Sequence, residues 1–96
     1  MARALWNDEI LAESEDTVEI EGSCYFPPDS IRWEYFEKSE TRTTCRWKGE
    51  ASYYSIRVNG KVNIDGAWYY PQPSEAAQAL GIKDRLAFWK GVRIER

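Results

Sequence analysis

Apolar and polar residues alternate in several short segments of the chain, and a period of two predicts β-strands. In segment 17–22, Val18 and Ile20 share one face, while a threonine and two glutamates share the other. Segments 2–6 and 9–14 predict two further strands around the turn pair Asn7-Asp8. We therefore expect the first quarter of the chain to be strands with one buried face.

The clearest pattern is in the middle of the chain. Segments 51–58 and 61–70 are rich in tyrosine, isoleucine and valine, and Asn59-Gly60 separates them. Asn-Gly between two such segments favours a two-residue hairpin turn, because both turn positions need a positive φ. We expect this hairpin, with Gly66 marking a bulge in its second strand.

Proline and glycine divide the rest of the chain. Pro27-Pro28 interrupts the strand pattern, and Asp29-Ser30 offers side chains that cap a short helical turn. Segment 31–36 fits a strand and a helix face equally well. Ser74 is a candidate cap for a helix over 75–80, and Gly81 suits the left-handed position that follows a helix.

The last segment, 86–95, predicts one or two strands with a turn or bulge at Lys90-Gly91. No repeat and no glycine- or serine-rich linker divides the chain, so residues 1–96 are expected to form a single domain. The predicted fold is mainly β: a rolled antiparallel sheet of about six to eight short strands with one or two short helices.

The composition indicates that the chain can form a hydrophobic core without disulfides or a bound metal. Of the 96 residues, 43% are hydrophobic, and five tryptophans and six tyrosines supply most of the large rings. Such rings bury about 150–250 Å² each, so a few of them fill much of a small core. We expect most rings to be core and a few to line a groove.

The charge balance excludes some partners. Thirteen lysines and arginines are scattered among 16 aspartates and glutamates, with a net charge of −3. Nucleic-acid binders usually carry a basic patch or a basic net charge, so nucleic acid and anionic membranes are not expected as partners. No apolar stretch resembles a signal peptide or a membrane span, so a cytoplasmic location is expected.

The chain has no histidine and two cysteines. A structural zinc site takes four Cys or His ligands, so no metal site is expected, and a histidine base is excluded. We expect no cofactor. Any catalysis would use carboxylates, lysine, tyrosine or cysteine. In a reducing cytosol Cys24 and Cys45 are expected as thiols, and a disulfide between them would need an oxidising compartment.

Charged residues beside Cys45 suggest two kinds of chemistry. Arg46 and Lys48 favour a thiolate at Cys45, because nearby cations stabilise it. In an extended strand, however, Cys45 and Trp47 would share one face, and both cations would lie on the opposite face, away from the sulfur. A buried, inert thiol is the alternative. Arg46 and Lys48 together suit a phosphate or carboxylate, which Gly49 would let approach the backbone; a solvated strand face is the alternative.

Two further groups are candidates. An aromatic-walled pocket is the usual form of a small-molecule site, with core packing as the alternative. Glu19 and Glu21 share a strand face and suit a divalent cation, with a solvated edge as the alternative. The complete set of expected ligand-binding residues is Arg46, Trp47, Lys48, Tyr54, Trp68 and Tyr70, with Cys45 and Lys48 as catalytic candidates.

Several motifs resemble one family over nearly the whole chain. They are the runs 44–49 (Thr-Cys-Arg-Trp-Lys-Gly), 51–54 (Ala-Ser-Tyr-Tyr) and 67–71 (Ala-Trp-Tyr-Tyr-Pro), with Arg3, Trp6, 25–27 and 87–89. The family is catalogued as domain of unknown function 427 and has also been labelled a nucleotidyltransferase-type domain. Its usual pattern has proline where Arg46 stands. The resemblance implies a mainly β fold, comparable with the β-tent architecture, whose zinc-binding members use four cysteines that this chain lacks.

Three functions follow as hypotheses. The first is a binding module for a small molecule, which includes the option of an anion; Trp47, Trp68 and Tyr70 would form the wall, and Arg46 and Lys48 would supply the charge. The second, suggested by the family label and Lys48, is an enzyme of nucleotidyl or related phosphoryl transfer. The third is thiol-dependent chemistry at Cys45. A homodimer through an exposed strand edge is a further expectation.

Overall fold

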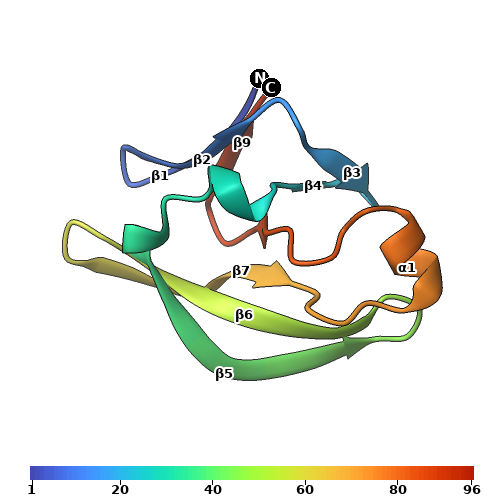
Figure 1. Cartoon of the computed structure of the whole chain (residues 1–96). Helices are drawn as coiled ribbons and strands as arrows, with labels where there is room; N and C mark the ends of the chain where they lie inside the picture. Colours follow the sequence, from blue (N-terminus) through green and yellow to red (C-terminus); the bar gives the residue numbers. More distant parts are fainter.

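The computed structural model describes residues 1–96 and contains nine strands, one short α-helix and two 3-10 turns (Figure 1). In chain order these are β1 (Ala2–Trp6), β2 (Glu9–Ser14), β3 (Val18–Ile20), β4 (Ser23–Tyr25), η1 (Pro28–Ser30), η2 (Trp33–Tyr35), β5 (Phe36–Cys45), β6 (Gly49–Val58), β7 (Lys61–Tyr69), α1 (Glu75–Ala79), β8 (Ala87–Phe88) and β9 (Arg93–Glu95).

The strands form three antiparallel sheets in the orders β2-β1-β9, β3-β4 and β5-β6-β7-β8. In Figure 1 the three-stranded sheet lies at the top, the four-stranded sheet lies below it, and the two termini lie side by side. The mainly β, antiparallel fold is confirmed. The structure has nine strands where about six to eight were expected, and β4 and most of β5 lie in segments for which no strand was predicted.

Both predicted hairpins are confirmed at their turns. Asn7 and Asp8 have φ values of 50° and 65° between β1 and β2, and Asn59 and Gly60 have 49° and 80° between β6 and β7. Asparagine, aspartate and glycine tolerate this left-handed region, so the turns form where the local chemistry allows them. The bulge near Gly66 is also confirmed, because the β6–β7 register shifts between Tyr54 and Ile56.

The expected strand through residues 45–49 is wrong. Cys45 pairs with Gly49 at the end of the β5–β6 ladder, and residues 46–48 form the tight turn between the two strands. Gly49 has a φ of 111°, and an added Cβ would lie 3.3 Å from the carbonyl oxygen of Gln72. This backbone suits glycine alone, so the predicted alternation of side chains across residues 45–48 does not exist.

Segment 31–36 is neither a single strand nor a single helix, the two structures that its sequence fitted. Ile31 forms an isolated bridge with Ala12, residues 33–35 form η2, and β5 begins at Phe36. In η1 no side chain caps the turn, and the Ser30 hydroxyl instead donates back to the carbonyl of Pro27 at 2.7 Å. The capping expectation for 29–30 is therefore wrong, although the helical turn itself is present.

The C-terminal predictions agree with the structure. Ser74 caps α1 by accepting a hydrogen bond from the backbone N–H of Ala77, and Gly81 follows the helix with a φ of 83°. Lys90 and Gly91 form the turn between β8 and β9, both with positive φ. No helix here has the length and apolar character that crossing a membrane requires.

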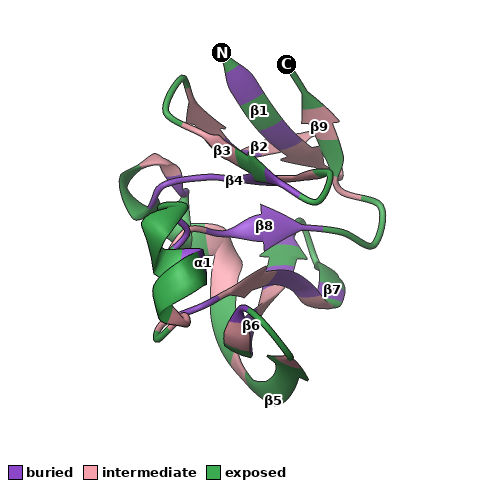
Figure 2. Ribbon diagram, turned by 90° about the vertical axis from the view of Figure 1, so that its right-hand side faces the viewer, coloured by how far each residue is buried: buried purple, intermediate pink, exposed green.

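Buried side chains form two clusters, one against each face of the four-stranded sheet. The first core cluster joins that sheet to β1 and β2 and includes Leu11, Phe26 and Ile56. The second core cluster joins it to β3, β4 and α1 and includes Tyr25 and Tyr53. Figure 2 shows the consequence: β4 and β8 are buried between layers, whereas the edge strand β5 is largely exposed.

Candidate functional site

A small pocket opens on the second-cluster face of the four-stranded sheet. Its volume is about 170 Å³, and it is lined by Lys48, Tyr53, Trp68, Tyr70 and Trp89. Tyr53 and Trp68 are direct partners in the β6–β7 ladder, so their side chains share a face. Tyr70 is two residues beyond Trp68 and faces the same way. Three of the expected site residues, Lys48, Trp68 and Tyr70, therefore meet here.

The rings of this pocket are held in fixed orientations. Trp68 and Trp89 meet edge to face, with centroids 5.8 Å apart, and Tyr53 lies 6.5 Å from Trp89. Their polar atoms already have partners within the chain: the Tyr53 hydroxyl bonds Thr43 at 2.8 Å, the Trp68 indole N–H donates to the Tyr25 hydroxyl at 3.2 Å, and the Trp89 indole N–H donates to the Asp65 carbonyl at 2.6 Å. The rings thus offer apolar faces to the pocket.

Lys48 supplies the charge. Its side chain is only 9% exposed, and its ammonium donates to Oε1 of Glu21 at 2.6 Å. The nitrogen also lies 5.4 Å from the centroid of Tyr70 and 5.6 Å from that of Trp47, within cation–π range. Burial is the largest single influence and disfavours the ammonium, but the hydrogen bond to Glu21 together with the charge interactions with Tyr25, Tyr70 and Glu21 outweighs it, so the pKa of Lys48 lies above its ordinary value.

Glu21 is the exposed partner in this ion pair. Its side chain is 56% exposed, and the indole N–H of Trp47 donates to its second oxygen at 3.3 Å. The bonds from Lys48 and then Trp47 hold the pKa of the Glu21 carboxyl below its usual value. A lysine ammonium has three N–H donors, and the bond to Glu21 uses one of them. The ammonium also lies beside the ring of Tyr70.

The turn that carries Lys48 is clamped to the segment before α1. The backbone N–H of Ser74 donates to the carbonyl of Lys48 at 2.9 Å, and the Ser74 hydroxyl donates to the carbonyl of Trp47 at 2.5 Å. Gly49 lets the two segments approach closely, since any side chain there would meet residues 72–74. The position of the ammonium is therefore set by backbone contacts as well as by Glu21.

The other expected residues lie outside this pocket. Trp47 is 39% exposed and stands beside Glu21, and Arg46 is exposed and makes no hydrogen bond or ion pair. Tyr54 follows Tyr53 in β6 and therefore faces the opposite side of the sheet, where it packs against the first core cluster. Cys45 is half-buried beside the second core cluster.

The carboxylate and thiol pairs do not form. Glu21 has a φ of 54° in the β3–β4 turn and pairs with Lys48, whereas Glu19 pairs with Arg96. The two carboxylates thus serve different cations. Cys24 is buried in the first core cluster and Cys45 lies beside the second, and both are free thiols.

Sequence reasoning missed Tyr53, Trp89 and Glu21 as members of the site. Alternation along the predicted hairpin was a usable signal for Tyr53, because it places residues 51 and 53 on one face and 54 on the other. No local signal existed for Trp89 or Glu21. Glu21 is 27 residues from Lys48 in the chain, and only the packing of β3–β4 against the β5–β6 turn brings them together.

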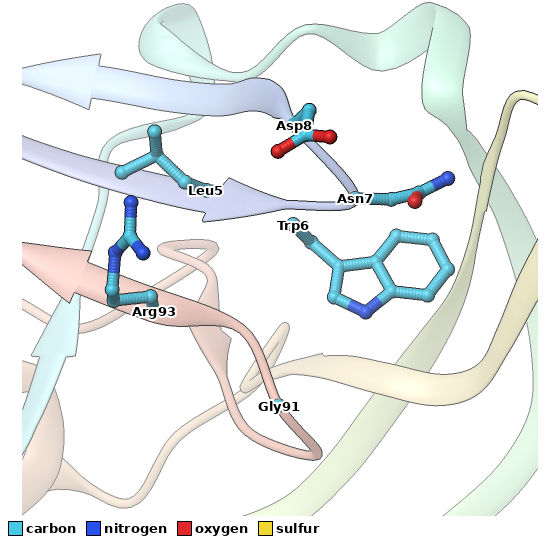
Figure 3. A pocket seen from close by; sticks show the side chains of 6 residues that line it. All are labelled: Leu5, Trp6, Asn7, Asp8, Gly91 and Arg93. Carbon is cyan, nitrogen blue, oxygen red and sulfur yellow. The ribbon is translucent and has the colours of Figure 1, made fainter.

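A larger hollow of about 390 Å³ lies beside the β1–β2 turn (Figure 3). Figure 3 shows its side chains pointing in different directions: Trp6 and Asn7 extend past the turn, Asp8 points away from them, and Leu5 and Arg93 lie on the other side. No polar groups converge there, and none of the expected site residues takes part.

The family model described as Domain of unknown function (DUF427), with the name NTP_transf_9, matches residues 1–96. The match therefore includes the turn that carries Lys48 and both strands of the β6–β7 hairpin. No curated protein matches the chain.

Proposed function

This chain belongs to the family described as domain of unknown function (DUF427), and from that premise we propose that it is a binding module for a small anionic molecule with a flat apolar part. The ligand's anionic group would accept hydrogen bonds from Lys48. Its flat part would lie against the rings of Trp68, Tyr70 and Trp89.

One observation carries this proposal. A buried ammonium stands in the wall of an aromatic pocket, and its ion-pair partner, Glu21, faces solvent. Charge-assisted hydrogen bonds are shorter and stronger than neutral ones, so the Lys48 ammonium is the strongest hydrogen-bond donor that the pocket offers to a ligand. A carboxylate or phosphate oxygen suits it.

The size of the pocket supports a small ligand. A volume of about 170 Å³ is below the roughly 300–1,000 Å³ of sites for drug-sized molecules. The ring faces favour a flat, apolar partner, because the indole and phenol atoms that bond within the chain are not free to bond a ligand.

No comparable observation favours the alternatives. Metal-dependent nucleotidyl or phosphoryl transfer uses a cluster of carboxylates, and here Glu21 is the one carboxylate bonded to Lys48. Thiol chemistry at Cys45 has no cation in bonding contact to support it, since Lys48 donates to Glu21 and Arg46 makes no contact.

The test is a titration of isotope-labelled protein with benzoate, a flat carboxylate, and with benzyl alcohol as its neutral counterpart. The readout is the indole N–H resonances of Trp68 and Trp89, assigned with Trp68→Phe and Trp89→Phe. We expect benzoate to shift both resonances and benzyl alcohol to shift them at concentrations at least about tenfold higher, as one charge-assisted hydrogen bond predicts.

Substitutions in the turn separate the role of Lys48 from a general charge effect. Lys48→Met keeps the apolar stem and should weaken benzoate binding about tenfold or more, whereas Lys48→Arg should retain most of it. Arg46→Met removes a neighbouring exposed cation and should leave binding unchanged. Equal affinity of Lys48→Met and the unaltered protein, or no shift at either indole, would overturn the proposal.

A further inference from the structure

A second aromatic pocket lies on the opposite face of the same hairpin, and it differs from the first in charge. Its volume is about 260 Å³. We call it the aromatic cage, and its lining residues are Pro28, Trp33, Tyr54, Tyr69, Asp84 and Leu86. Tyr54 and Tyr69 come from β6 and β7, Trp33 from η2, and Asp84 from the loop between α1 and β8.

The rings of the cage form a continuous group. Tyr54 and Tyr69 are stacked with centroids 5.0 Å apart, and Trp33 lies 5.2 Å from Tyr54 at a tilt of 59°. The Trp33 indole N–H donates to the carbonyl of Pro28 at 3.1 Å, which fixes a ring that is 41% exposed. Large exposed rings that are held in place by polar contacts are typical of binding surfaces.

Asp84 is a carboxylate without a partner. It is exposed, has a φ of 62°, and its backbone N–H donates to the carbonyl of Tyr70 at 3.1 Å. Its side chain makes no hydrogen bond and no ion pair. The backbone bond holds the loop that carries Asp84, which lines the cage.

No cation of the chain occupies the cage. The lysine–ring contacts of this protein are those of Lys48 with Trp47 and Tyr70 and of Lys90 with Trp89. Lys38 pairs with Tyr54 across β5–β6, yet it does not line the cage. Burial, then Tyr69 and Asp84, raise the pKa of the Tyr54 hydroxyl to about 12, so the groups around this ring disfavour negative charge.

We propose that the aromatic cage binds a quaternary ammonium group, with Trp33, Tyr54 and Tyr69 contacting the methyl groups and Asp84 balancing the charge. Ring faces attract cations electrostatically, and a methylated ammonium is weakly hydrated enough to enter an apolar cage. A neutral ligand would leave Asp84 unused, and an anion would meet a carboxylate. The inference is independent of the function proposed for the Lys48 pocket.

The test compares choline with 3,3-dimethyl-1-butanol, in which carbon replaces the charged nitrogen and the shape is kept. The readout is the indole N–H resonance of Trp33 in the full chain. We expect choline to bind about tenfold more tightly than the neutral alcohol, as a desolvated cation–π contact predicts. Equal shifts by the two compounds, or no shift at Trp33 with choline, would overturn the proposal.

Two variants complete the test. Asp84→Asn keeps the left-handed backbone and removes the charge, so it should weaken choline binding several-fold. Asp8→Asn is the matched control, an exposed aspartate with a φ of 65° in another turn, and it should leave binding unchanged. If Asp84→Asn binds choline like the unaltered protein, the cage is not a cation site. N-acetyl-trimethyllysine amide is titrated beside choline to identify the source of the ammonium group. Tighter binding of the lysine derivative indicates a modified side chain, and tighter binding of choline indicates a free small molecule.

Discussion

The hydroxyl of Ser74 donates a 2.5 Å hydrogen bond to the carbonyl of Trp47, and the same oxygen accepts from the backbone N–H of Ala77 to cap α1. One side chain thus joins the start of the helix to the turn that carries Lys48. The stability of the helix and the placement of the ammonium are coupled through this atom.

Ser74 is therefore expected to be worth more than an ordinary helix cap. Ser74→Ala should destabilise the protein by about 1–3 kcal/mol, because it removes the cap and a second hydrogen bond. Ser74→Asp, normally a good cap, should stay destabilised, since a carboxylate cannot donate to the Trp47 carbonyl. Ser74→Thr keeps both functions and should stay close to the unaltered protein in chemical denaturation. Full stability of Ser74→Asp would contradict the coupling.

The Glu21–Lys48 pair should give stability a dependence on pH. The pKa of Glu21 in the folded chain lies below its ordinary value of 4.5, chiefly through its bond from Lys48. A depressed carboxyl pKa contributes stability that is present above the unfolded value and is lost as pH falls through the folded one. The difference in melting temperature between Glu21→Gln and the unaltered protein should therefore be present at pH 6–7 and shrink progressively as the pH falls below the ordinary carboxyl pKa of 4.5. A difference that persists unchanged at low pH would show another cause.

Glu21 should also compete with an anionic ligand for Lys48. Removing its charge in Glu21→Gln leaves the ammonium without a nearby carboxylate, so benzoate affinity should rise about two- to fivefold, as an exposed ion pair predicts. Calorimetric titration measures this, and Glu19→Gln is the control, because Glu19 pairs with Arg96 instead. A fall in affinity with Glu21→Gln would mean that Glu21 positions Lys48 for binding.

Gly66 is expected to be required by packing. A Cβ at this position would lie 2.8 Å from Cγ of Asn63 and 2.9 Å from Cδ1 of Ile56, so Gly66→Ala should cost about 1–3 kcal/mol of stability. A double-mutant cycle with Asn63→Ala identifies the cause. The glycine substitution should cost clearly less in the Asn63→Ala background, and an equal cost in both backgrounds would exclude the clash with Asn63.

The two thiols should differ in accessibility. Cys24 is 4% exposed in the first core cluster, whereas Cys45 is half-buried at the end of β5. Iodoacetamide should modify one cysteine per native chain and both after unfolding, and Cys45→Ser should abolish the native reaction. Rapid modification of Cys24 in the native protein would contradict the packing of the first core cluster.

Features of the fold that depend on the local chemistry of a few neighbouring residues could be predicted from the sequence. Asn7-Asp8 and Asn59-Gly60 accept a positive φ, so both hairpin turns could be predicted without knowing their surroundings. Ser74 before an alanine-rich segment likewise predicted the start of α1. Each of these features depends on contacts within a few residues.

The strand β5 shows why other features could not be predicted. Its side chains are mostly exposed, so it carries little hydrophobic alternation, and its strand conformation comes from pairing with β6. The turn at 46–48 was also missed, because it depends on the close approach of Gly49 to Gln72, a contact that exists only in the folded chain.

The amino-acid pattern was enough to predict a mainly β fold, its tightest turns and the presence of rings and cations around residues 45–70. Which of these residues meet could be seen only in the folded chain: Lys48 contacts Glu21, Trp89 contacts Trp68, and Tyr54 lies on the face opposite Tyr53. Turns and caps are stabilised by neighbours in the chain, whereas a pocket is formed by the packing of sheets whose contacting residues are far apart in sequence.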